Sequence, residues 1–307
     1  MRRMPQPIPY QGSKREIALE ILKLAPDHVK LLIEPFTGSG ALSVRAAYEH
    51  KADRFWLNDI NRPLMTLIET IVNEPAQIAN RYEELWQRQL GQERSFYNAA
   101  RNEFNATHRS DLFLYLLARC VKASIRYNSD GHFNQSPDNR RKGRHPDSMR
   151  KEILAFSQLL RGKMQVTSQD YRSILGAFDA NSTLIYLDPP YQGTSGSRDS
   201  RYYSGVDFNE FVAFMVDLNR ANAMFIVSYD GRRGKTTYGQ RLPTSLKLCH
   251  AEIDAGRSTQ STLLGRRDKT YESLYLSESL MARLALTEPD VETLLDPHRS
   301  QQLTLVL

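Results

Sequence analysis

Residues 29–40, Val-Lys-Leu-Leu-Ile-Glu-Pro-Phe-Thr-Gly-Ser-Gly, decide the fold class of this chain. Val29–Ile33 is a compact apolar run typical of a buried strand, and Thr37-Gly38-Ser39-Gly40 then predicts a tight turn. Helical character follows over Ala41–Tyr48, and the next strand-like run, Arg54–Leu57, comes just before an acid. Strand, glycine turn, helix, strand and acid in this order indicate a doubly wound α/β nucleotide-binding unit.

The rest of the chain changes pattern twice. Residues 63–121 are rich in helix formers, and residues 128–146 are polar and loop-like. We predict one α/β domain from 1–60 and 160–280, interrupted by a helical and hairpin-containing insertion at 61–159, with a tail at 281–307. Further predicted elements are helices over 14–24, Phe208–Arg220 and Val291–Leu295, and strands over Met164–Thr167, Leu184–Leu187, Met224–Ser228, Leu246–Ile253 and Tyr271–Leu276.

The glycine turn limits the kind of ligand. Its glycines let the backbone pass close to a bound molecule, and Thr37 or Ser39 is placed to cap the helix. It contains no Lys, lacks the Gly-Lys-Ser/Thr ending of a P-loop, and departs from the Gly-x-Gly-x-x-Gly of dinucleotide sites. We therefore expect an adenosine-type ligand whose charged part is not phosphate, with Asp59 bonding its ribose hydroxyls.

Two other segments are candidates for the same site. Tyr10-Gln11-Gly12-Ser13-Lys14 is a polar loop that opens a helix, and its amides with Lys14 could hold a carboxylate. Asp170-Tyr171 follows a predicted strand and could reach an adenine ring. Taken alone, the first is a helix cap and the second a helix start.

A catalytic candidate, Asp188-Pro189-Pro190-Tyr191, closes the apolar run Leu184–Leu187. A carboxylate, two rigid prolines and an aromatic ring at the end of a strand can hold a flat, weakly nucleophilic amine in front of an electrophile. Prolines also end strands for structural reasons alone, so the catalytic interpretation depends on the other motifs of the chain.

The charge of the chain favours a polyanionic partner. The formal net charge of the 307 residues is +6, and the excess gathers in three Gly/Ser/Thr-rich stretches. One such cluster would indicate only a solvated surface, but three favour nucleic acid. The clusters are Arg140-Arg141-Lys142-Gly143-Arg144; Arg232, Arg233, Lys235 and Arg241; and Arg257, Arg266, Arg267 and Lys269.

The apolar runs and the cysteines of the chain indicate its cellular compartment. No run of about 18 apolar residues is present, so no membrane span is expected, and no apolar stretch follows the basic start to form a signal peptide. Cys120 and Cys249 are far apart in unrelated contexts, which argues against disulfides and a thiolate metal site. We expect a reducing compartment, the cytoplasm.

Five segments together resemble the Dam-type (D12 class) N6-adenine-specific DNA methyltransferases. They are Tyr10–Lys14, Glu34–Gly40, Asn58–Asn61, Arg126-Tyr127-Asn128-x-x-Gly131-x-Phe133-Asn134 and Asp188–Tyr191, with Tyr271–Leu274 similar to the closing segment of the family. The resemblance implies a Rossmann-like methyltransferase fold with a DNA-recognition insertion, S-adenosylmethionine as methyl donor and no metal. The donor-binding residues it implies are Tyr10, Gly12, Ser13, Lys14, Glu34, Pro35, Phe36, Thr37, Gly38, Ser39, Gly40, Asp59, Asp170 and Tyr171.

The same resemblance implies roles in catalysis and DNA binding. Asp188 and Pro189 would accept hydrogen bonds from the adenine N6 amine, with Pro190 completing the motif and Tyr191 stacking on a flipped base. Arg126–Asn134 would form a DNA-reading hairpin in which Tyr127 and Asn128 wedge beside or read bases. The residues predicted to bind DNA are Arg126, Tyr127, Asn128, Asn134, Arg140, Arg141, Lys142 and Arg144, the last four through phosphates.

Several alternatives stay open at this point. Gln135-Ser136-Pro137-Asp138 departs from the family pattern, which leaves the recognised DNA sequence open. Methylation of cytosine N4 or of adenine in RNA is a second reading, and a catalytically silent DNA-binding relative is a third. Cytosine C5 chemistry is excluded, because neither cysteine follows a proline. Expected partners are double-stranded DNA and a cognate restriction or defence system, and a monomer is expected.

Overall fold

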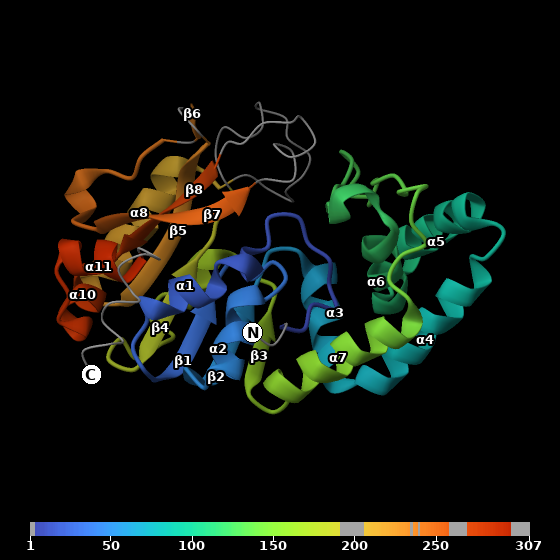
Figure 1. The fold of residues 1–307 in the computed structure, drawn as a ribbon, viewed down its shortest axis with the longest axis horizontal. Helices are drawn as coiled ribbons and strands as arrows, with labels where there is room; N and C mark the ends of the chain where they lie inside the picture. Colours follow the sequence, from blue (N-terminus) through green and yellow to red (C-terminus); the bar gives the residue numbers. More distant parts are fainter. Residues whose placement is uncertain (1–3, 191–205, 234–235, 239, 258–268, 296–307) are drawn as a thin grey trace.

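The computed structural model of the 307-residue chain describes residues 4–190, 206–233, 236–238, 240–257 and 269–295. Its centre is one mixed sheet in the strand order β3-β2-β1-β4-β5-β8-β7, with β6 pairing β5 (Figure 1). The first five strands in this order run parallel, and β8 is antiparallel to both β5 and β7. The bounds are β1 Val29–Glu34, β2 Ala52–Asn58, β3 Met164–Thr167, β4 Thr183–Leu187, β5 Met224–Arg233, β6 Thr236–Tyr238, β7 Cys249–Arg257 and β8 Lys269–Leu276.

The central strands are apolar on both faces because helices cover both sides of the sheet. Alternate residues of β1 and β4 belong to different clusters: Leu32 and Leu184 lie in the one that includes α1 (Ala18–Lys23) and α2 (Ala41–Tyr48). Ile33 and Ile185 pack instead with side chains of α8 (Phe208–Arg220). This arrangement confirms the predicted doubly wound, Rossmann-like α/β fold.

A helical part lies beside the sheet, with α4, α5 and α6 farthest from it (Figure 1). It consists of α3 (Arg62–Asn73), α4 (Pro75–Arg88), α5 (Glu93–Thr107), α6 (Ser110–Arg119) and α7 (Pro146–Leu160). Helix α7 packs against α2 as well as against α3 and α4, so it joins the helical part to the sheet. The predicted boundaries at 60, 160 and 280 stay predictions.

Some elements differ from the sequence-based expectation. Helices α2 and α8 and strand β3 have the predicted bounds, but β7 begins at Cys249 rather than Leu246, because η4 (Thr244–Leu246) and the left-handed Lys247 precede it. Helix α10 (Glu278–Leu284) was not expected; it begins where the Ser277 hydroxyl accepts a hydrogen bond from the Leu280 amide. The predicted helix near Val291 is α11 (Glu288–Leu295). None of the described helices is both long and apolar enough to cross a bilayer.

Candidate active site

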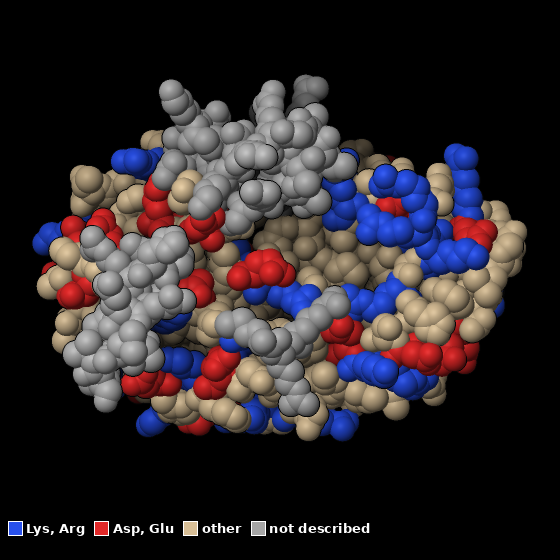
Figure 2. All heavy atoms as spheres, viewed as in Figure 1, with Lys and Arg blue, Asp and Glu red and all other residues tan. Residues whose placement is uncertain are grey.

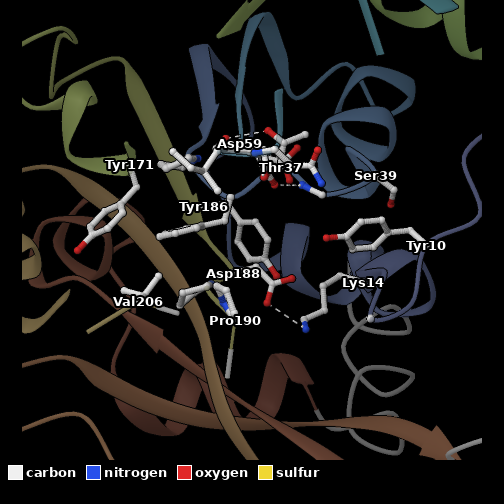
Figure 3. Close-up of a pocket in the computed structure, with 18 of the residues that line it drawn as sticks. Tyr10, Lys14, Thr37, Ser39, Asp59, Tyr171, Tyr186, Asp188, Pro190 and Val206 are labelled. Atoms are coloured by element: carbon white, nitrogen blue, oxygen red, sulfur yellow. Dashed lines mark hydrogen bonds and ion pairs between the residues drawn. The ribbon is translucent and has the colours of Figure 1, made fainter. Parts of the chain in front are cut away.

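A pocket opens at the carboxyl ends of β1, β2 and β4 (Figure 3). In this sheet order β1 and β4 are the neighbours from which the chain winds outward in opposite directions, and ligands bind at such switch points. The pocket brings together nearly all predicted donor-binding residues, with Asp188, Pro189 and Pro190 on one of its walls. These donor-binding residues are Tyr10, Gly12, Ser13, Lys14, Glu34, Pro35, Phe36, Thr37, Gly38, Ser39, Asp59, Asp170 and Tyr171.

Gly40 is the predicted donor-binding residue that does not line the pocket. Its φ of 68° places it in the left-handed region as the N-cap residue of α2. A glycine adopts this backbone without strain, so Gly40 sets the direction in which α2 leaves the loop. Tyr191 and the Gly193–Gly205 loop lie outside the described residues, as do the side chains of the basic residues at 232–235 and 257–269.

Hydrogen bonds within the loop between β1 and α2 fix its shape. The expectation that Thr37 or Ser39 caps α2 is wrong: the Thr37 hydroxyl donates to the Glu34 carbonyl at 2.8 Å, and Ser39 Oγ lies 3.1 Å from Ser13 Oγ. The first turn of α2 is served instead by Glu34 Oε1, which accepts from the Ser43 amide at 2.9 Å. A glycine is needed at position 38, because its φ is 53° and a Cβ there would lie 3.1 Å from the Tyr10 ring.

Glu34 is a buried carboxyl group in the lining of the pocket. Burial raises the pKa of Glu34 to about 7, against the lowering effect of its hydrogen bonds with Ser43. The nearby Asp188 carboxylate also raises this pKa. A cationic group entering the pocket would relieve this cost, so the site favours a ligand that carries positive charge.

Asp59 at the end of β2 joins two loops. Its Oδ2 accepts from the Gly38 amide at 3.0 Å, and its Oδ1 accepts from the Asn61 amide at 2.9 Å. Burial raises its pKa, although both amides oppose the shift. Asp59 therefore holds the glycine loop in place and also lines the pocket.

The Lys14 side chain points to Asp188 in the pocket lining (Figure 3). Its Nζ lies 3.0 Å from Asp188 Oδ1 and 3.4 Å from Glu272 Oε2 on β8. Burial raises the pKa of Asp188 to about 6, while Lys14 lowers it and Glu272 raises it further. Burial also disfavours a charged Lys14, but Asp188 and Glu272 together outweigh this effect and raise the lysine pKa. Asp188 is thus ionised at neutral pH and held by an ammonium group.

Tyr171 and Asp170 both line the pocket, but their side chains make different contacts. The Tyr171 ring points away from the other labelled side chains in Figure 3 and packs against Phe36, with ring centroids 5.1 Å apart. It supports Phe36 from the core. The Asp170 carboxylate accepts from the Arg172 amide at 2.9 Å and pairs with the Arg172 side chain at 2.7 Å.

Sequence reasoning missed pocket residues that the fold brings in from elsewhere. Tyr186 on β4 lies beside Asp188 in Figure 3, and Ile125 comes from the segment after α6. Val206, Asp207 and Glu210 come from the start of α8. The only local signal for these was Asp207, a helix N-cap whose carboxylate accepts from the amides of Asn209 and Glu210.

The predicted DNA-reading segment forms a small antiparallel turn. Tyr127 bridges Phe133, and the Asn105 side chain of α5 bonds both the amide and the carbonyl of Phe133. Tyr127 itself is buried, with its hydroxyl donating to Asn61 Oδ1 at 3.1 Å, so it could touch a base only by leaving these contacts. Asn134 is exposed, and Arg126 and Asn128 are half-buried.

The basic run that follows is fixed to the helical part by hydrogen bonds to its backbone carbonyls. The carbonyls of Asp138, Lys142 and Arg144 accept from the side chains of Arg119, Gln89 and Tyr82 respectively. Arg140 and Arg141 both pair with Asp138 and are 84% and 69% exposed, and Lys142 is 59% exposed. Arg144 differs: it turns inward, where Nη1 donates to the Gln6 carbonyl at 2.7 Å and lies 3.3 Å from Glu152 Oε1. Figure 2 shows Lys and Arg gathered over the helical part, beside a hollow in this face.

The fold and this pocket define an α/β enzyme of the Rossmann-like methyltransferase class. The family model of the D12 class N6 adenine-specific DNA methyltransferases matches residues 10–253. The chain belongs to this family.

Individual relatives carry matching names. The DNA N-6-adenine-methyltransferase of Escherichia phage P1 is 28% identical over 235 residues, which cover 72% of this chain and 29% of that protein. The type II methyltransferase M.MjaIII of Methanocaldococcus jannaschii is 25% identical over 66% of this chain and 74% of its own length. The DNA adenine methylase of Serratia marcescens is 28% identical over 65% and 72% respectively. The chain therefore spans less than a third of the phage protein but about three quarters of the other two.

Proposed function

We propose that this protein transfers a methyl group from S-adenosylmethionine to N6 of adenine in double-stranded DNA. The observation that carries the proposal is one continuous pocket that holds both the glycine loop of β1 and the Asp188-Pro189-Pro190 end of β4. A donor site and an acceptor site in one cavity are what direct transfer between two bound molecules requires.

The donor fits the first half of this pocket. Asp59 and the tightly bonded loop at 34–40 offer a carboxylate and a close backbone, while Phe36 and Ile60 give apolar walls. Glu34, whose charged form is disfavoured by burial, would gain from a donor that carries a sulfonium and an ammonium group. S-adenosylmethionine supplies the electrophilic methyl group when bound. The chain itself binds and orients the two partners.

The acceptor amine fits the second half. Lys14 engages Oδ1 of Asp188, with its Nζ at 3.0 Å. We assign Oδ2 and the Pro189 carbonyl as acceptors for the two N6 protons of adenine. These bonds would draw the N6 lone pair out of the ring and stabilise the positive charge that develops on nitrogen. Because N6 lies inside the paired duplex, the base has to be flipped out, which costs roughly a few kcal/mol.

We assign DNA binding to the insertion at 61–159. The exposed Arg140, Arg141 and Lys142 are placed to contact phosphates, which position a duplex without reading its sequence. We assign Asn128 and Asn134 to base or groove contacts, and Tyr127 to support of the turn. We assign Arg144 a structural role, because its side chain bonds the Gln6 carbonyl and pairs with Glu152. The protein acts as a monomer in the cytoplasm in this proposal, with a restriction or defence system as candidate partner.

The test is direct analysis of the product. Purified protein is incubated with tritiated donor and double-stranded DNA, and the DNA is digested to nucleosides for mass spectrometry. We expect N6-methyladenine, and we expect Asp188→Ala to abolish it while DNA affinity stays within about twofold. Label in N4-methylcytosine, or a preference for RNA, would replace the proposal by one of its enzymatic alternatives. DNA binding without any label would make the chain a silent relative.

A further inference from the structure

Lys14 lies between carboxylates from two different strands. Its Nζ is 3.0 Å from Asp188 Oδ1 after β4 and 3.4 Å from Glu272 Oε2 on β8. The lysine side chain is 8% exposed, and those of Asp188 and Glu272 are 21% and 16% exposed. Two carboxylates therefore share this ammonium in a poorly solvated place. Among the described residues, Tyr186 also raises the pKa of Lys14, and Asp188 raises the pKa of Glu34.

Glu272 reaches Lys14 past an intervening strand. Strand β5 lies between β4 and β8, and its pairing with β8 shifts register between Ser228 and Gly231, where Gly231 pairs with Glu272. Such irregularities re-aim side chains. A Cβ on Gly231 would lie 2.7 Å from the Tyr271 carbonyl oxygen, so only glycine fits there without a shift of the backbone. The buried Ser228 hydroxyl donates to Glu272 Oε2 at 3.4 Å and adds a second hold on the carboxylate.

We propose that Glu272 is a positioning residue for methyl transfer, which holds the Lys14 ammonium against Oδ1 of Asp188. The inference rests on the proposed function, since it assigns the other oxygen to the adenine amine. Glu272 does not line the pocket, so it acts through Lys14 rather than on the bound base. Without Glu272, the ammonium would lose its contact with β8 and shift relative to Asp188.

This role predicts a particular electrostatic effect. Glu272 raises the pKa of Asp188, whereas Lys14 lowers it. Removing the Glu272 charge should therefore lower the pKa of Asp188 and make it a weaker acceptor for the amine. Removing the Lys14 charge should move the same pKa the other way. A residue that only stabilises the sheet would leave the pH dependence unchanged.

The kinetic test uses the full chain with Glu272→Gln, Glu272→Asp and, as an exposed control on α3, Glu69→Gln. For Glu272→Gln we expect kcat at saturating donor and DNA to fall about tenfold, with DNA affinity within about twofold, because the loss is in positioning. In the pH profile of kcat, the rise on the acidic side should move to lower pH. Glu272→Asp keeps the charge, so its kcat should rise at the same pH as that of the wild type. Glu69→Gln should match the wild type in kcat, DNA affinity and pH profile.

A double-mutant cycle tests whether Glu272 acts through Lys14. At a pH where Asp188 is ionised in every variant, Glu272→Gln should lower kcat in the wild type but have almost no effect in a Lys14→Met background. Equal effects in both backgrounds would overturn the inference. So would a Glu272→Gln enzyme with wild-type kcat and pH profile, or a loss of rate that only follows the folded fraction measured by thermal unfolding.

A spectroscopic readout separates this inference from the proposed function. The Asp188 carboxyl carbon, labelled with carbon-13 and assigned by its absence in Asp188→Asn, is titrated by NMR in donor-free protein. We expect a lower midpoint in Glu272→Gln than in wild type. This result holds even if the substrate is not adenine, whereas an unchanged midpoint would refute the electrostatic link in an enzyme that does methylate adenine.

Discussion

The Nζ of Lys14, at the start of η1 (Lys14–Glu16), lies 3.0 Å from Oδ1 of Asp188 at the end of β4. This ion pair joins the loop before the first helix to the strand end that carries the proposed acceptor, and both residues line the same pocket. Its consequences for activity can be measured.

The ion pair gives the first prediction, the pH dependence of methyl transfer. Burial raises the pKa of Asp188 to about 6, and only the ionised form accepts both a lysine and an amine hydrogen bond. We therefore expect kcat to rise with pH through about 6 and then level off, as measured with tritiated donor from pH 5 to 8. A rate that is independent of pH across this range would contradict the role of Asp188.

Removing the lysine gives the second prediction. Lys14→Met deprives Asp188 of the charge that lowers its pKa, so the acidic limb of kcat should shift to higher pH. At pH 7 we expect kcat to fall by about 10- to 100-fold, because a charge-assisted hydrogen bond is lost at the reacting centre. Lys23→Met on α1, which removes the exposed pair with Glu20, is the matched control and should leave kcat unchanged. A shift of the limb to lower pH would count against the pairing.

Glu34 gives a prediction about stability without donor. Burial raises its pKa to about 7 from 4.5, so the folded state keeps a proton that the unfolded chain has lost between these values. The free energy of unfolding should therefore fall as pH rises from about 4.5 to 7, by up to ~3 kcal/mol from this group.

Glu34→Gln keeps an oxygen for the Ser43 amide but cannot ionise. The variant should lose this part of the pH dependence, so that it is more stable than wild type at pH 8 and little changed at pH 4.5, as measured by urea unfolding. Donor binding should weaken in the same variant, which calorimetry would detect. Parallel stability curves for the two proteins would exclude Glu34 as the titrating group.

The exposed arginines give a prediction for DNA. The double variant Arg140→Ala with Arg141→Ala should weaken binding uniformly across sequences and reduce the salt slope of log K by about 2. Fluorescence anisotropy from 50 to 300 mM salt measures both quantities. Arg220→Ala, an exposed arginine on α8, is the control and should keep the wild-type slope. A loss confined to particular DNA sequences would place Arg140 and Arg141 at base edges instead.

Local patterns were sufficient for the parts of the fold that depend on neighbouring residues. The apolar run at β1, the glycine turn and the helix from Ala41 to Tyr48 follow from periodicity and turn chemistry, and all three occur where they were predicted. The start of β7 does not lie where it was predicted. Lys247, which precedes it, has a left-handed backbone conformation that a lysine does not indicate. Helix α10 was missed although Ser277 is a recognisable N-cap residue.

Residues of the candidate site that belong to sequence motifs could be predicted. Residues that only the folded chain brings to the site could not. Asp188 and the glycine loop stand in motifs, and the pocket brings them together as the strand order requires. Glu272 lay in a segment similar to the family's last one, yet nothing in the sequence says that a bulge in β5 lets it reach Lys14. The basic run predicts Arg144 as a phosphate ligand, and no local pattern predicts its contacts with Gln6 and Glu152. Such pairings depend on three-dimensional register rather than on spacing along the chain.

The contact between Lys14 and Glu272 joins a residue near the beginning of the chain to one in the strand that enters the sheet last in sequence order. A nascent chain that does not yet include β8 therefore lacks the carboxylate that we propose positions Lys14 beside Asp188. Contacts between residues so far apart in the sequence slow folding, so we expect methylation only after β8 has joined the sheet.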